Sequence, residues 1–273
     1  MFLFALSQAP EVNWLRTSVA FIIMHFMLYP SSNGYNSYQD RDETSIGGLK
    51  YPPKISKNLF KATLLLDILA VIASLLVSIW FSLFSLIFIL VSRSYSSRRI
   101  RLKKYPIIGF ITVFIFQGAF VYLMAASAIS NFSFEYYFTL TNIICMCVAS
   151  LFIGSIYPLT QIYQHEADKK DGVISLSYKL GYRGTFIFSS TLFTIASLLL
   201  FYYFGLKHQK AVFVIFLIIM LPVIVKLLFW FNEVRKDTQN ANFENTMSMN
   251  LLTSICMNIY FVILILNNSF TWI

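Results

Sequence analysis

Long apolar stretches alternate with short charged segments along nearly the whole chain. Full spans are predicted at about 12–32, 58–77, 79–93, 105–127, 136–160, 184–204, 211–231 and 247–267. Each is roughly as long as a helix needs to cross about 30 Å of hydrocarbon, although 79–93 is short. Because a helix satisfies its own backbone hydrogen bonds in lipid, the pattern predicts an all-α, polytopic membrane bundle.

The first apolar fragment, residues 1–8, is too short to be a span and is bounded by Pro10. At about 1.5 Å per residue it covers roughly 12 Å. We therefore expect a first helix that is truncated here, making about nine helices in total. The natural reading frame is expected to extend upstream of Met1 by roughly ten to fifteen mostly apolar residues.

Composition supports a single integral-membrane domain over residues 1–273. Hydrophobic residues make up 58% of the chain and charged residues 12%, and the mean hydropathy is +0.68. An ordinary soluble domain carries about twice that share of charge. Membrane lipid and small molecules are therefore the expected partners, and nucleic acid is not.

The basic residues predict the orientation in the membrane. If the 12–32 span ends in the cytoplasm, three of the 21 Lys and Arg residues fall outside (Arg16, Lys207 and Lys210) and Lys226 lies within a span, leaving 21 − 4 = 17 on the cytoplasmic side. Cytoplasmic loops carry such an excess. We expect a cytoplasmic N-terminus, an external C-terminus, and location in the cell inner membrane.

A sequence repeat links two polar segments that follow apolar spans. Residues 29–40 read YPSSNGYNSYQD and residues 157–168 read YPLTQIYQHEAD, at an offset of 168 − 40 = 128 residues. Both copies fall on the same predicted side of the membrane, so the chain is interpreted as two parallel four-helix repeats. Functional sites of such proteins commonly lie between the repeats.

Polar residues in the two copies recur at helical spacing, and each copy contains a proline that can kink the helix. They are Asn33, Asn36 and Asp40 in the first copy, and Gln161, Gln164 (or His165) and Asp168 in the second. Oxygen ligands of this kind suit Mg²⁺, which shares its coordination shell with water and phosphate. Nearby cations can hold phosphate oxygens. Lys54, Lys57, Lys103 and Lys104 are instead expected to belong to ordinary solvated loops.

The two segments resemble the aspartate-rich motifs of the UbiA superfamily of intramembrane prenyltransferases. Residues 36–43, NSYQDRDE, followed by Ile46-Gly-Gly-Leu, resemble the first motif, an asparagine with aspartates four and eight residues on. Residues 164–168, QHEAD, followed by Gly172 and Ser175-Leu176, resemble the second, two aspartates four apart. Thr44 and Gln164 depart from these patterns. Asp42 or Glu43, and Glu166 or Asp171, stand nearby as replacements.

The resemblance implies Mg²⁺-dependent transfer of an isoprenoid chain from its diphosphate to an aromatic or other lipid-precursor acceptor, as in lipid or quinone biosynthesis. Asp40 and Asp168 are the implied catalytic residues. The expected metal ligands are Asn36, Asp40, Asp42, Gln164, Asp168 and Asp171. Residues expected near the diphosphate are Arg41, Lys50, Lys169 and Lys170, and those near the isoprenoid or acceptor are Asn33, Tyr35, Tyr38 and Tyr163.

Two other interpretations remain open on the sequence. One is a transporter, since parallel repeats and intramembrane acids also occur in transporters. The other is a cyclase-like or inactive relative with the same fold. Asp67 lies within the 58–77 span, where it is expected either to line the cavity or to bond to a neighbouring helix.

Overall fold

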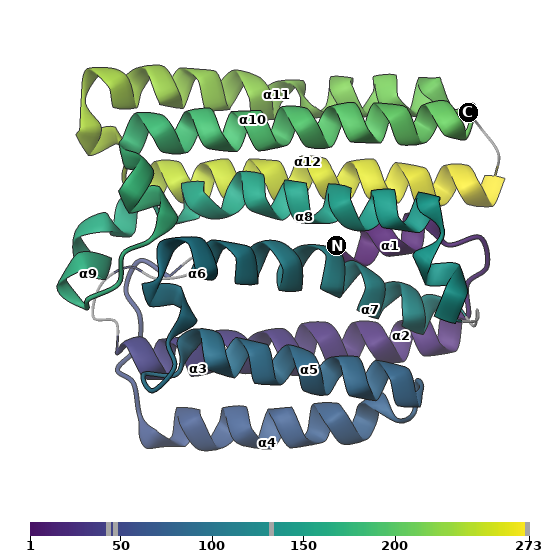
Figure 1. The fold of residues 1–273 in the computed structure, drawn as a ribbon, viewed down its shortest axis with the longest axis horizontal. Helices are drawn as coiled ribbons and strands as arrows, with labels where there is room; N and C mark the ends of the chain where they lie inside the picture. The colour runs from purple at the N-terminus through teal and green to yellow at the C-terminus, as the bar shows by residue number, and fades with distance from the viewer. Residues whose placement is uncertain (42–44, 46–48, 131–133, 271–273) are drawn as a thin grey trace.

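The computed structural model describes residues 1–41, 45, 49–130 and 134–270, and within them nine helical runs lie side by side (Figure 1). The first half of the chain contributes α1 (Phe2–Gln8), a continuous run of α2 (Trp14–Ile22), η1 (Ile23–Leu28) and α3 (Tyr29–Asp40), then α4 (Lys57–Ser74), α5 (Ile79–Ser96), and a second continuous run of α6 (Pro106–Val113), η3 (Phe114–Ala119) and α7 (Phe120–Ile129). The second half contributes α8 (Leu140–Thr160), α10 (Leu176–Leu206), α11 (Lys210–Lys236) and α12 (Phe243–Phe270).

Short elements connect these runs. They are η2 (Leu102–Lys104), η4 (Phe134–Phe138), η5 (Ile162–Gln164), α9 (His165–Lys170) and η6 (Thr238–Asn240). Six helical segments of the described chain are long and apolar enough to cross a membrane: 79–96, 106–129, 140–170, 176–206, 210–236 and 243–268. The predicted all-α membrane bundle is confirmed.

The short helix α1 is packed inside the bundle. Phe4 is fully buried, and its ring lies 5.1 Å from that of Phe261 on α12 and 5.2 Å from that of Tyr122 on α7. Aromatic burial of this kind contributes strongly to packing. The opening fragment therefore joins the two halves of the bundle.

Helix α8 packs against helices of both halves. Gly118, in η3, allows close approach, because a Cβ there would lie 2.3 Å from the Cα of Ser150 on α8. The Ser150 hydroxyl also accepts a hydrogen bond of 3.0 Å from the Ala119 amide. The polar bond in an apolar layer ties the two helices together.

The two repeat segments lie at the same end of the bundle (Figure 1), as parallel repeats require. Each contains the helix irregularity that its proline predicts, but of a different kind. Before Pro30 the helix widens into the π-type segment η1, and the Tyr29 amide bonds to the Met24 carbonyl. After Pro158 it tightens into the 3₁₀ turn η5 before α9 begins. A proline has no amide hydrogen, so a carbonyl of the preceding turn loses its usual donor. The π-type segment and the 3₁₀ turn are two ways in which a helix adjusts to this loss.

Candidate active site

A cavity of about 420 Å³ opens at this end of the bundle, where α3, α5 and α8 end and where α6 and α12 begin. Its wall contains the three polar residues of each repeat copy: Asn33, Asn36 and Asp40, and Gln161, Gln164 and Asp168. The helical spacing seen in the sequence therefore brings both copies to one site.

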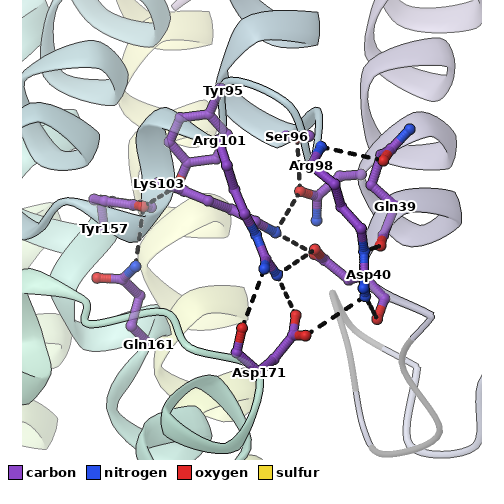
Figure 2. A network of polar contacts seen from close by, with 11 residues as sticks. Gln39, Asp40, Tyr95, Ser96, Arg98, Arg101, Lys103, Tyr157, Gln161 and Asp171 are labelled. Atoms are coloured by element: carbon purple, nitrogen blue, oxygen red, sulfur yellow. Dashed lines mark hydrogen bonds and ion pairs between the residues drawn. The ribbon is translucent and has the colours of Figure 1, made fainter.

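The wall is polar at the helix ends and largely apolar deeper in the bundle. Phe88, Val91, Val113 and Phe116 line this deeper part, together with the amide side chains of Gln117 and Asn250. Between the two parts, the hydroxyls of Tyr95 and Tyr157 hydrogen-bond to each other, and Gln161 Nε2 donates to the Tyr157 hydroxyl at 2.9 Å (Figure 2). The cavity thus offers a charged mouth followed by an aromatic, apolar interior.

Asp40 is held by cations from the loop that joins α5 to α6. Its carboxylate forms an ion pair with Lys103, and Arg101 Nη2 lies 3.8 Å from Asp40 Oδ1 (Figure 2). The side chains of Asp40, Arg101 and Lys103 are only 10%, 12% and 11% exposed. Lys103 also donates to Asn36 Oδ1 at 3.1 Å. Burial makes these charge–charge contacts stronger than surface pairs.

Arg101 connects the first copy to the turn that follows the second. It forms an ion pair with the Asp171 carboxylate, and its Nη1 donates to the Asp171 carbonyl at 3.1 Å. Arg98 lies 3.5 Å from the same carboxylate and donates to the Gln39 carbonyl at 2.7 Å. Arg101 adopts a left-handed backbone conformation, with φ 52°, which is uncommon for a non-glycine residue and can mark a functional position.

Three buried polar atoms of this network have no hydrogen-bond partner among the described residues: Asp40 Oδ1, Arg101 Nε and Gln161 Oε1. A buried polar atom without a partner costs free energy unless a ligand or water satisfies it. An acceptor oxygen and a cationic donor of this kind are suited to a metal ion and to a phosphate oxygen, respectively.

The predicted diphosphate residues lie elsewhere. Among the described residues of the cavity wall, Arg41, Lys50, Lys169 and Lys170 do not occur. Lys50 is exposed and pairs with Glu244 at 2.5 Å, and this carboxylate raises the pKa of Lys50. The ammonium of Lys169 lies 5.7 Å from the centre of the Tyr178 ring.

Of the predicted isoprenoid and acceptor residues, Asn33 and Tyr163 line the cavity. Tyr35 and Tyr38 are absent from its described wall. The Tyr35 ring instead lies beneath the guanidinium of Arg93, 3.9 Å from its carbon atom. Tyr38 faces Phe60, with ring centroids 5.2 Å apart. Asp67 bonds to neighbouring helices through Arg93 and Ser31.

The expectation that Lys103 belongs to a solvated loop is wrong, and sequence reasoning also missed Arg101 and Arg98. All three fall in the basic run 98–104, which reads as a cytoplasmic loop because such loops are generally rich in Lys and Arg. The available signal was the density of that run, five Arg or Lys residues in seven positions. Only the folded backbone distinguishes Lys103 from the exposed Lys104.

The family departures have different outcomes. Asp42, Glu43 and Thr44 lie outside the described residues. In the second copy, Asp171 lines the cavity, whereas Glu166 is exposed and does not contribute to the described wall. Asp171 is therefore the better placed of the two replacements for the carboxylate missing at Gln164.

The donor set fits a magnesium ion that shares its shell with a ligand. No group of three or more Asp, Glu, His or Cys side chains in the described ranges is close enough to hold a metal alone. The cavity does supply carboxylate and amide oxygens from both copies, and no donor in the described part of the chain bonds to Asp40 Oδ1. Mg²⁺ is typically held by one or two carboxylates, water and substrate phosphates.

These features define a helical membrane protein with an acid-and-base cavity at one end of the bundle. The model of the UbiA prenyltransferase family matches residues 1–252, and the chain belongs to that family. It is an integral membrane protein. No curated protein sequence matches the chain.

Solved structures show the same fold. A digeranylgeranylglyceryl phosphate synthase studied in membranes is 23% identical, with a TM-score of 0.61, covering 97% of this chain and 90% of that one. A UbiA homologue from Archaeoglobus fulgidus bound to GPP and Mg²⁺ is 17% identical, with a TM-score of 0.65 and coverages of 97% and 94%. A UbiA homologue from Archaeoglobus fulgidus bound to DMAPP and Mg²⁺ is 15% identical, with a TM-score of 0.64, and the match covers 97% of this chain and 94% of that one.

Proposed function

We propose that this protein transfers an isoprenoid group from its diphosphate to an acceptor in a Mg²⁺-dependent reaction within the membrane. The observation that carries the proposal is the convergence of both repeat copies and Lys103 on one cavity with an apolar interior. The charged mouth suits a diphosphate, and the apolar interior suits an isoprenoid chain. The Archaeoglobus homologue, with the same fold, binds GPP or DMAPP together with Mg²⁺.

Each residue of the site has a proposed role in binding the substrate. Lys103, which lines the cavity, would hold diphosphate oxygens, while Arg101 keeps Asp40 and Asp171 in position. Asp40, Asp168 and Asp171, with the amides of Asn36 and Gln164, would hold Mg²⁺, and Asp42 stays a predicted ligand. When bound, Mg²⁺ neutralises charge on the leaving diphosphate.

The reaction breaks the bond between the first isoprenoid carbon and the diphosphate oxygen, and the electron pair leaves with the diphosphate. The allylic carbon then bonds to the acceptor, which loses a proton. The rings of Tyr95, Tyr157 and Tyr163 line the cavity and offer π faces that stabilise a cation. The apolar wall around Phe88 and Phe116 limits the access of water to that cation.

The test is diphosphate release from geranyl diphosphate by the purified protein in lipid nanodiscs, with and without Mg²⁺ and with candidate acceptors. We expect Mg²⁺-dependent release and a prenylated product detected by mass spectrometry. Release with only cyclic or hydrolysed isoprenoid products would favour a cyclase-like relative. No release under any condition, with a folded protein, would contradict the proposed function.

The orientation proposed for this site is cytoplasmic, in the inner membrane, on the basis of the basic bias of the loops. Reporter fusions within residues 97–105 should read as cytoplasmic, and a fusion after Ile273 should read as external. Two fusions that report the same side would contradict this topology.

A further inference from the structure

A buried ion pair lies outside the cavity, where α3, α4 and α5 meet. Arg93 on α5 pairs with Asp67 on α4 through both its Nε, at 2.8 Å, and its Nη2. The side chains are 19% and 10% exposed. A charge within a membrane bundle is costly and is generally retained for a function.

The Asp67–Arg93 pair also contacts α3. The Ser31 hydroxyl lies 2.5 Å from Asp67 Oδ1 and 2.9 Å from the Thr63 carbonyl. Arg93 Nη2 donates to Ser31 Oγ at 3.4 Å, and the guanidinium stacks over Tyr35 at 3.9 Å. One ion pair therefore fixes two successive turns of α3.

Further polar contacts continue from this anchor along α3 and α5 towards the cavity. Ser32 bonds to Ser92 at 2.6 Å, and Ser96 donates to Asn36 Oδ1 at 2.8 Å. At the helix ends, Arg98 bonds to the Gln39 carbonyl. These contacts occur at Ser32, Asn36 and Gln39, so they recur about once per helical turn along α3 towards Asp40.

Hydrophobic packing alone does not fix such a register. The α3 segment, YPSSNGYNSYQD, is mostly polar, and burial in lipid adds no hydrophobic driving force for its packing, so its interhelical polar contacts help to set its position. A buried ion pair contributes little net stability compared with apolar replacements, but it tolerates only a narrow geometry. Its place in the fold is therefore better explained by positioning than by stability.

We propose that Asp67 and Arg93 are positioning residues that set the register of α3, so that Asn36 and Asp40 face Lys103 and the cavity. Neither residue is among the described residues of the cavity wall, so neither is expected to contact the substrate. The inference rests on the proposed function for its activity readout, and hydrogen exchange of α3 provides a readout that does not.

The decisive variant removes both charges together. Asp67→Asn combined with Arg93→Met leaves no unpaired buried charge, so the protein should fold. We expect the Mg²⁺ concentration for half-maximal diphosphate release to rise about tenfold, with kcat at saturating Mg²⁺ within about twofold. Amide hydrogen exchange across residues 29–40 should accelerate, because α3 loses its contacts with the Asp67–Arg93 ion pair.

The matched control removes another buried polar contact between the same two helices. Ser74 and Ser85 bond to each other at 2.9 Å at the opposite end of α4 and α5. Replacing both by alanine should leave the Mg²⁺ dependence and the exchange of α3 unchanged. A control that shifts both readouts equally would reduce the ion pair to a general packing role and overturn the proposal.

Each remaining outcome also decides the question. A folded double variant with wild-type Mg²⁺ dependence or wild-type α3 exchange overturns the proposal. If the double variant does not fold, Ser31→Ala keeps both charges and should give the same two shifts at smaller size. If the wild-type protein releases no diphosphate, the proposed function fails, and exchange of α3 alone decides the positioning.

Discussion

The two copies of the repeat share a sequence pattern but are held in place by different chemistry. The first copy is a continuous helix, α3, fixed by the charged pair of Asp67 and Arg93. The second is broken by η5, and its short helix α9 is held by the buried His165 and, at its C-terminal end, by the ion pair of Asp171 with Arg101. His165 Nε2 lies 2.9 Å from Ser177 Oγ, which bonds to Thr185 at 3.0 Å.

The same cation contacts an acid of each region. Arg101 lies close to Asp40, which also pairs with Lys103, and it pairs with Asp171, three residues beyond the aspartate of the second copy. Asp168 still lines the same cavity. The repeated spacing of the polar residues in the two copies therefore determines which residues face the cavity. The residues that bond to them come from the surrounding helices and loops.

The largest expected effect tests whether both acids act on the same substrate. Asp40→Asn and Asp168→Asn should each reduce Mg²⁺-dependent diphosphate release by about a thousandfold, since each removes a charge that would bind the metal. Glu166→Gln, an exposed acid on α9, is the matched control and should retain activity. A large loss from only one aspartate would break the equivalence of the copies.

The two anchors should differ in stability. Asp67→Asn leaves the buried Arg93 charge unpaired and should lower the free energy of unfolding by about 3–5 kcal/mol. His165→Phe keeps the stacking on Tyr182, whose ring centroid lies 5.1 Å away, and loses a neutral hydrogen bond, so about 1–3 kcal/mol is expected. Unfolding in detergent micelles measures both. His208→Asn, at an exposed residue, serves as control, and equal losses for the two anchors would contradict the distinction.

The Lys103→Met variant tests the role of the cation that pairs with Asp40 of the first copy. Loss of one charge-assisted contact, worth about 1.5–3 kcal/mol, should raise the KM for geranyl diphosphate about tenfold to a hundredfold. The control is Lys104→Met, the exposed neighbour, which should leave KM unchanged. If both variants behave alike, the basic loop acts only through its overall charge.

The smallest expected effect concerns the departure in the second copy. Gln164→Asp adds a carboxylate to the cavity wall and should lower the Mg²⁺ concentration for half-maximal release about threefold to tenfold. Gln239→Asp, a loop residue of η6 outside the described cavity wall, is the control. An unchanged Mg²⁺ titration in Gln164→Asp would show that this position does not face the metal.

The repeat spacing predicted the part of the site that helical periodicity controls. Asn33, Asn36 and Asp40 share a face of α3, and their second-copy counterparts reach the same cavity despite the 3₁₀ break. The apolar spans likewise predicted the bundle, because span length and hydropathy follow directly from the thickness of the bilayer.

The cationic part of the site could not be predicted in the same way. Lys103 and Arg101 lie in a loop whose path depends on a left-handed backbone turn at Arg101, and neighbouring cations in that loop remain exposed. Tyr35 was expected near the substrate, but the pairing of Arg93 with Asp67 places a cation over its ring. Such contacts depend on helices far apart in sequence.

Both copies are proposed to hold one Mg²⁺–diphosphate group, and a double-mutant cycle on Asp40 and Asp168 tests this most directly. Diphosphate release is measured for the wild type, the two Asn variants and the double variant. Residues that act as a unit are not additive. We predict that the double variant loses only slightly more activity than either single variant, by less than about tenfold. Losses that multiply, to about a millionfold in total, would show that the two aspartates act at separate sites and would contradict the account.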